Sequence, residues 1–278
     1  SIRYGYNSLY KVAPTPSLAL RYQKDLYTFR LSYGRGFRAP DFKELFLAFF
    51  DSNHNVFGNE ELTAEQSDNY AFSVSFAQSL AQSQWKWEVA LFHNDLRDKI
   101  ELVQAGSAQS GPQPFTYLNV DEVRTQGARV DVEYGRKVFR TRAGAGLIGL
   151  EEVNDGLTVI PINYYPQWNA SISYEEPLTE LDIELYASGV GSREFLIRED
   201  EETRSFRQEA FSMLDLSAGR SFLDSRLDLR IGARNLLGVE TLNAIGTGSH
   251  SGSSTSSLLA TGRTFFITCT FHINKSHG

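Results

Sequence analysis

Apolar and polar residues alternate along most of this chain, in segments of about ten residues. In LYTFRLSYGRGF (26–37), every second residue is large and apolar or aromatic: Tyr27, Phe29, Leu31 and Tyr33. The same period of two returns as far as RTFFITCTFHI (263–273). A β-strand with one apolar face produces this period. The pattern predicts about eleven strands, each near the ~9–11 residues that a tilted strand needs to cross a bilayer.

Short and long connections between the predicted strands alternate strictly. The short ones are polar turns near residues 24–25, 81–83, 135–137, 175–179 and 223–225. The long ones lie within 39–64, 104–114, 151–161, 192–208 and 238–261. A barrel of the outer-membrane type has short periplasmic turns at one end and long extracellular loops at the other.

The alternation therefore favours an all-β fold, an antiparallel transmembrane β-barrel. The polar face supports this interpretation, because Asp131, Glu133, Asp228 and Arg230 suit a wet lumen better than a packed core. A soluble all-β protein with two sheets and one solvated face is the alternative.

The composition of the chain argues against several classes of function and of structure. The 278 residues carry a net charge of −7 and contain no basic stripe, which argues against nucleic-acid binding. The single cysteine, Cys269, cannot form an internal disulfide. No apolar run approaches the ~20 residues of a spanning helix. Because the chain begins at Ser1 within a pattern, we expect it to be a segment of a longer polypeptide.

Several motifs carry a family resemblance. Phe37-Arg38-Ala39-Pro40 ends a predicted strand, and Gly58-Asn59-x-x-Leu62 follows in the next loop. Phe92-His93-Asn94-Asp95, Asn235-Leu236-Leu237 and the terminal aromatic strand add to them. Together they resemble the TonB-dependent outer-membrane receptors over nearly the whole chain. One departure is Glu60, where the family's second box has proline.

The resemblance implies a 22-stranded barrel in the outer membrane of a Gram-negative bacterium, plugged by an N-terminal domain. Residues 1–278 would form the C-terminal part of that barrel, with the plug and the first half absent. The implied partners are outer-membrane lipid and lipopolysaccharide, the remaining N-terminal half of the receptor, TonB, and a surface lipoprotein. The implied function is uptake of a scarce metal chelate: haem first, with cobalamin or a ferric siderophore close behind.

The long loops hold the candidate ligand-binding residues. His54 lies between the two boxes, where haem receptors of this family are expected to keep a haem-facing histidine, and imidazole is a common haem-iron ligand. His250, in the last long loop, is a candidate for a second imidazole. Arg38 could bind an anionic ligand and Asn59 could contact the same ligand, although both also suit a role in shaping the loop.

Two further readings concern metal binding and activity. The acidic run containing Glu199, Asp200 and Glu201 offers oxygen ligands for Ca²⁺, or else a solvated loop tip. No enzyme motif is present, since there is no nucleophile elbow and no HExxH. A surface module that binds a host or partner protein and a passive porin-like channel are the functional alternatives to a receptor.

Overall fold

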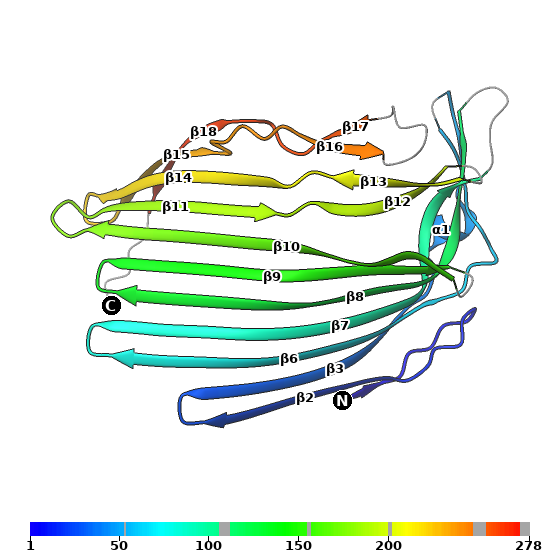
Figure 1. Cartoon of the computed structure of the whole chain (residues 1–278), viewed down its shortest axis with the longest axis horizontal. Helices are drawn as coiled ribbons and strands as arrows, with labels where there is room; N and C mark the ends of the chain where they lie inside the picture. Colours follow the sequence, from blue (N-terminus) through cyan, green and yellow to red (C-terminus); the bar gives the residue numbers. More distant parts are fainter. Residues whose placement is uncertain (53, 106–111, 155–156, 200–201, 247–253, 273–278) are drawn as a thin grey trace.

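The computed structural model describes residues 1–52, 54–105, 112–154, 157–199, 202–246 and 254–272. These residues form one large, mainly antiparallel sheet, a smaller sheet of four strands, and one short helix (Figure 1). The main path of the large sheet contains β1 (Ile2–Arg3), β2 (Thr15–Lys24), β3 (Tyr27–Arg38), β6 (Glu65–Leu80), β7 (Ser83–Gln104), β8 (Pro114–Arg136), β9 (Phe139–Asn154), β10 (Leu157–Glu176), β11 (Leu181–Val190), β14 (Phe211–Phe222), β15 (Leu227–Arg234) and β18 (Thr264–Phe271).

The strands of this path follow one another in sequence order, and each pairs antiparallel with the next. Among the described residues, eleven strands longer than the two-residue β1 make up the path, so the predicted all-β antiparallel fold is confirmed. The helix α1 (Phe42–Phe46) is five residues long. Within the described part of the chain, no helix has the length and apolarity needed to span a membrane.

One face of the sheet, the apolar face, exposes a continuous field of large apolar side chains. Register aligns them across strands: Leu20 pairs with Leu31, Leu31 with Phe72, and Phe72 with Leu91. Each of these four side chains is exposed. Because a soluble two-sheet protein would bury this face against another sheet, the exposure argues against the soluble alternative.

The opposite face, the polar face, carries ion pairs between strands, from β3 across β6 to β7 and from β9 to β8. Arg30 lies 3.6 Å from Glu88, and Arg142 lies 3.6 Å from Glu133. These side chains are about half exposed, except that of Glu133, which is 30% exposed. A charged and solvated wall of this kind is what a water-filled or plugged lumen needs.

The two ends of the sheet differ: one end has the predicted tight turns, whereas the predicted long loops at the other end contain additional strands. Tight turns close one end, and Asp25, Lys137 and Glu180 adopt positive φ there. At the other end, two predicted loops contain strands: β12 (Arg193–Glu199), β13 (Glu202–Gln208), β16 (Thr241–Gly246) and β17 (Ser254–Leu258) form the smaller sheet. The loop predicted over 151–161 is mostly strand, because β9 and β10 continue their pairing to Asn154 and Leu157.

The edges of the large sheet run in the same direction. Ten antiparallel steps separate β2 from β18 along the path, so the two strands have equal polarity. β1 pairs only with Thr15 and Pro16, which leaves most of β2 as an open edge. On its other side, β18 has no neighbour among the described strands. Both edges therefore present unpaired backbone groups, which lipid does not tolerate.

Candidate functional site

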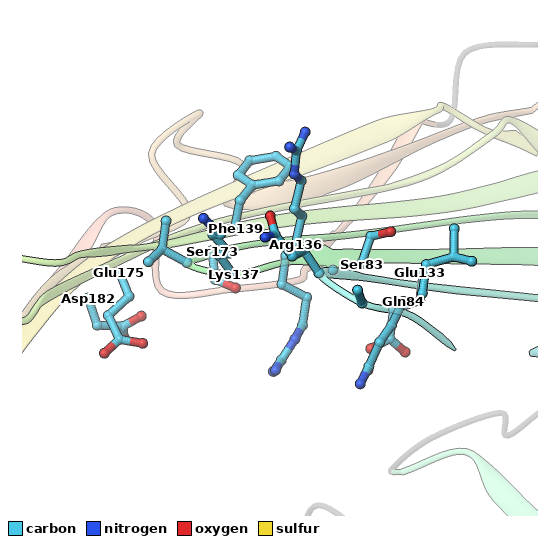
Figure 2. Close-up of a pocket in the computed structure, with 15 residues that line it drawn as sticks. Ser83, Gln84, Glu133, Arg136, Lys137, Phe139, Ser173, Glu175 and Asp182 are labelled. Carbon is cyan, nitrogen blue, oxygen red and sulfur yellow. The ribbon is translucent and has the colours of Figure 1, made fainter. Parts of the chain in front are cut away.

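The polar face is hollowed at the end that carries the tight turns. A hollow of about 470 Å³ lies beside the turns that join β6 to β7 and β8 to β9 (Figure 2). Glu133, Arg140, Glu175 and Asp182 are among its lining residues. Glu175 and Asp182 also line a second hollow of about 560 Å³ toward β14 and β15. The residues predicted to bind a ligand belong to the loops at the opposite end.

The first long connection folds back onto the polar face as a compact segment. This α1 segment (residues 39–64) contains α1, β4 (Ala48–Phe50) and β5 (Asn55–Phe57). β5 pairs with β4 and runs parallel to the start of β8. Leu45 and Leu62 of this segment form a buried cluster with Ile100 of β7, and Tyr10 and Tyr117 pack against this cluster. The segment is therefore anchored by a small apolar core of its own.

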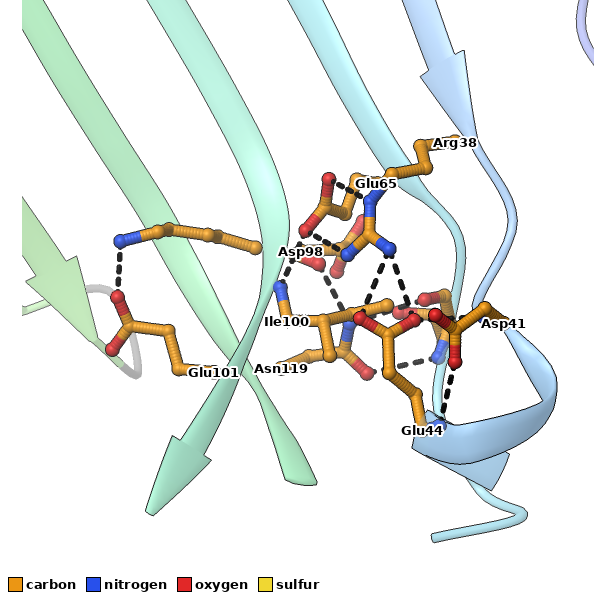
Figure 3. A network of polar contacts seen from close by, with 10 residues as sticks. Arg38, Asp41, Glu44, Glu65, Asp98, Ile100, Glu101 and Asn119 are labelled. Carbon is orange, nitrogen blue, oxygen red and sulfur yellow. Dashed lines mark hydrogen bonds and ion pairs between the residues drawn. The ribbon is translucent and has the colours of Figure 1, made fainter. Parts of the chain in front are cut away.

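Arg38 joins the α1 segment to the sheet (Figure 3). Its Nε and Nη2 atoms donate to the two carboxylate oxygens of Glu65, both at 2.7 Å. Its Nη1 atom donates to Glu44 in α1 at 2.9 Å. Glu44 also completes a capping box with Asp41, which fixes the start of α1. Glu65 in turn accepts a hydrogen bond from the Ile100 backbone N–H at 2.8 Å.

The charges in this network stabilise one another. Arg38 lowers the pKa of Glu65 below its ordinary value of 4.5, chiefly through its hydrogen bonds to the carboxylate. The same contact with Glu65 raises the pKa of Arg38. Both residues lie at the loop ends of their strands, and in β6 the apolar stretch begins five residues after Glu65, at Tyr70. The network therefore stands outside the apolar field of the sheet.

The second sequence box completes the anchoring. The Asn59 side-chain amide donates to the Tyr117 carbonyl at 2.9 Å, and its oxygen accepts from the Glu61 N–H at 2.9 Å. Leu62 is only 3% exposed. At Gly58, an added Cβ would lie 2.5 Å from the Leu45 backbone. In this box, Gly58 allows close backbone packing, Asn59 supplies hydrogen bonds and Leu62 supplies a buried apolar side chain.

His54 lies on the exposed side of the α1 segment. Its Nδ1 atom is 3.0 Å from Oδ1 of Asp51, and its backbone N–H donates to the same carboxylate oxygen at 2.7 Å. Within the described residues no contact is found for Nε2, and the side chain is 58% exposed. A carboxylate on one imidazole nitrogen is the usual way to orient the other nitrogen toward a metal.

One aromatic ring lies beside His54, and further aromatic side chains are exposed on the same segment. The Phe49 ring lies 5.3 Å from the His54 ring, centroid to centroid. Five phenylalanines of the α1 segment are exposed by 45% or more: Phe42, Phe46, Phe49, Phe50 and Phe57. Exposed aromatic groups at this density are unusual on a surface that binds nothing. The segment therefore presents an imidazole beside apolar rings.

The other predicted ligands have different outcomes. Arg38 and Asn59 have contacts typical of structural roles, and ligand binding by either stays a prediction. His250, Asp200 and Glu201 lie outside the described residues, as does the side chain of Glu199. Sequence reasoning missed Asp51 as the partner of His54 and the carboxylates that pair with Arg38. The spacing Asp51-x-x-His54 could have indicated the first pair, and Asp41-x-x-Glu44 could have indicated the capping box that positions Glu44.

A family model described as "TonB dependent receptor-like, beta-barrel" matches residues 1–236. A search of curated protein sequences found no match. Among solved structures, the siderophore receptor PirA from Pseudomonas aeruginosa is 16% identical with a TM-score of 0.67, over 95% of this chain and 43% of that one. The copper transporter OprC is 16% identical with a TM-score of 0.64, over 93% and 39%.

The FrpB iron transporter from Neisseria meningitidis is 12% identical with a TM-score of 0.63, over 90% of this chain and 38% of that one. At these identities the structures establish the fold alone, and the chain spans less than half of each. The family match covers most of the chain and agrees with the antiparallel meander, the short turns and the two sequence boxes. The chain belongs to the TonB-dependent receptor β-barrel family, a family of receptors and not of enzymes.

Proposed function

We propose that this chain is the C-terminal half of the barrel of a TonB-dependent receptor that takes up a scarce metal chelate. The rest of the polypeptide would supply the plug and the first half of the barrel, and TonB would provide the energy for transport. The family match supports this proposal, as do neighbours named as siderophore receptors and metal transporters. The polar face would then be the lumen wall, where the hollows near Glu175 face the plug.

The apolar face would contact the lipid of the outer membrane. Its exposed leucine, phenylalanine and tyrosine side chains need an apolar environment. Trp85, Trp87, Tyr164 and Trp168 lie on this face by register, which suits the aromatic girdles of outer-membrane barrels. In this orientation the tight turns are periplasmic, and the α1 segment is extracellular.

Haem is the chelate that the geometry supports best. The observation that carries this is His54, whose Nδ1 contacts Asp51 while Nε2 is left for a ligand. The exposed Phe49 and Phe50 rings offer apolar surface to a planar macrocycle. Cobalamin and ferric siderophores are the alternatives, and neither needs an imidazole to bind its metal.

The test is His54→Ala in the full-length receptor. We expect slower growth with haem as the sole iron source, and at least about tenfold weaker haem binding by absorbance titration. His272→Ala is the matched control, because His272 also pairs with a carboxylate, Asp228, at 2.8 Å and is about half exposed. Unchanged haem binding in His54→Ala would exclude His54 as the ligand, and growth on another chelate would then identify the cargo.

A surface module that docks a partner protein is the second candidate function. Phe42 and Phe50 support it, because they are 83% and 70% exposed and a surface lipoprotein or host protein could cover them. Phe42→Ser should then abolish capture of that partner and leave haem binding intact. For a passive channel we expect ion conductance in planar bilayers, which a plugged receptor lacks.

A further inference from the structure

The apolar face ends toward the loops in a row of aromatic and amide side chains. Register aligns Tyr33, Tyr70, His93 and Gln126 on four adjacent strands, and Tyr164 lies further along the same row. The Tyr33 and Tyr70 rings are 5.0 Å apart, and His93 Nδ1 lies 3.1 Å from the Gln126 oxygen. Amphipathic rings of this kind mark the boundary between hydrocarbon and headgroups.

Two residues closer to the loops, the same face becomes ionic. Arg35, Asp68, Asp95 and Arg124 are aligned by register, followed by Glu151. Arg124 lies 3.5 Å from Asp95 and 3.3 Å from Glu151. Charged residues in this position face neither the lumen nor the hydrocarbon. They stand at the depth of the lipid headgroups, if the apolar face lies in the membrane as proposed above.

Arg97 lies two residues beyond Asp95 on the same face of β7, and together with the aligned charged residues it forms the ionic belt. Two arginines of the ionic belt, Arg35 and Arg97, share one buried carboxylate. Arg35 donates from Nε and Nη2 to Asp68, both at 2.9 Å, and Arg97 donates from Nη2 to Asp68 at 3.1 Å. The Asp68 side chain is 7% exposed, whereas those of Arg35 and Arg97 are 33% and 49% exposed. The triad carries one net positive charge, and Asp68 holds both guanidinium groups in place at the surface. Preorganised guanidinium groups are well suited to bind phosphate oxygens.

We propose that Arg35 and Arg97, held by Asp68, bind a phosphate group of the glycolipid headgroup in the leaflet that faces the loops. Tyr33 and Tyr70 lie directly below, where the first carbons of the acyl chains would pack. The inference rests on the proposed membrane placement, and it adds to that placement a defined site for a phosphorylated lipid. In an outer membrane this lipid is lipopolysaccharide.

The test uses Arg97→Gln in the full-length receptor, stripped of lipid in detergent and incubated with micelles that contain bisphosphorylated lipid A. Bound lipid is counted by native mass spectrometry. We expect about three- to tenfold less bound lipid than in the wild type, and retention in Arg97→Lys. Asp68 keeps Arg35 and the Tyr33 hydroxyl, at 2.7 Å, as partners in both variants.

Arg142→Gln is the matched control, since Arg142 is 56% exposed and pairs with one carboxylate among the described residues, Glu133, but on the polar face. It should bind lipid as the wild type does. Equal binding by Arg97→Gln, or equal binding of dephosphorylated lipid A, would each overturn the proposal. Because lipid is counted on purified protein, failure here is distinct from failure of haem uptake.

Discussion

At the scale of single residues, the family motif around Arg38 is explained by pairing. One guanidinium group satisfies a carboxylate in β6 and another in α1, so it joins a strand end to a loop. The Arg38 side chain is 44% exposed and solvent screens part of the interaction, so we assign the pair with Glu65 about 1–2 kcal/mol. The pair therefore helps to hold the α1 segment against the sheet at neutral pH.

Low pH should loosen the α1 segment. The pKa of Glu65 is lowered in the folded state, so its stabilising contribution is complete above about pH 4.5 and is lost as the pH falls through the lowered pKa. Hydrogen exchange of residues 39–64 in the full-length receptor should therefore be constant from pH 8 to 5, after correction for intrinsic rates, and should rise below about pH 4.5.

Two variants sharpen this measurement. Glu65→Gln cannot titrate, so we expect faster exchange at neutral pH and little further change in acid. Glu60→Gln is the control, because it removes an exposed carboxylate from the same segment. A rise centred near pH 6.5 would contradict the assignment, since it would implicate a histidine instead.

At the scale of elements, the α1 segment shows where sequence reasoning stopped. The strand before it and the strand after it followed from the period of two, because one face must be apolar and the other polar. The helix of five residues and the two strands of three residues within the segment are too short to show a hydrophobic period in the sequence. Their positions depend on contacts with Ile100 and Tyr117, which are remote in sequence.

Gly58, at the start of the second box, should be required for the α1 segment to pack as it does in the structure. In Gly58→Ala, the methyl group would meet the Leu45 carbonyl group at 2.5 Å, so α1 must move. We expect a loss of about 1–3 kcal/mol in local stability, measured as faster proteolysis of residues 39–64 in the folded receptor. Gly34→Ala is the control, since its Cβ meets nothing within 4 Å. Equal proteolysis of the two variants would contradict the prediction.

The candidate site was predictable only in part for a related reason. His54 was identified from its residue type and its place between two boxes, but its Asp51 partner and the Phe49 ring depend on the local fold of the loop. The ionic belt was missed completely. Arg35, Asp68 and Arg97 are far apart in sequence, and only the strand register brings them together.

At the scale of the whole molecule, strand direction limits what can close this sheet. β2 and β18 have the same polarity, because an even number of antiparallel steps separates them. Antiparallel closure therefore needs a block of further strands whose first and last members both run opposite to β2 and β18. Such a block contains an odd number of strands. The expected 22-stranded barrel meets this condition, because eleven further strands close it.

A second copy of this chain cannot meet the condition. Two copies inserted in the same orientation would bring β18 of one beside β2 of the other with equal polarity, which gives parallel pairing and breaks the ladder pattern of the barrel. We therefore expect residues 1–278, refolded alone in detergent, to yield no heat-modifiable dimer on a denaturing gel. Co-refolding with the N-terminal half of the receptor should yield a heat-modifiable band. A stable homodimeric barrel from this chain alone would show that the edges close in another way.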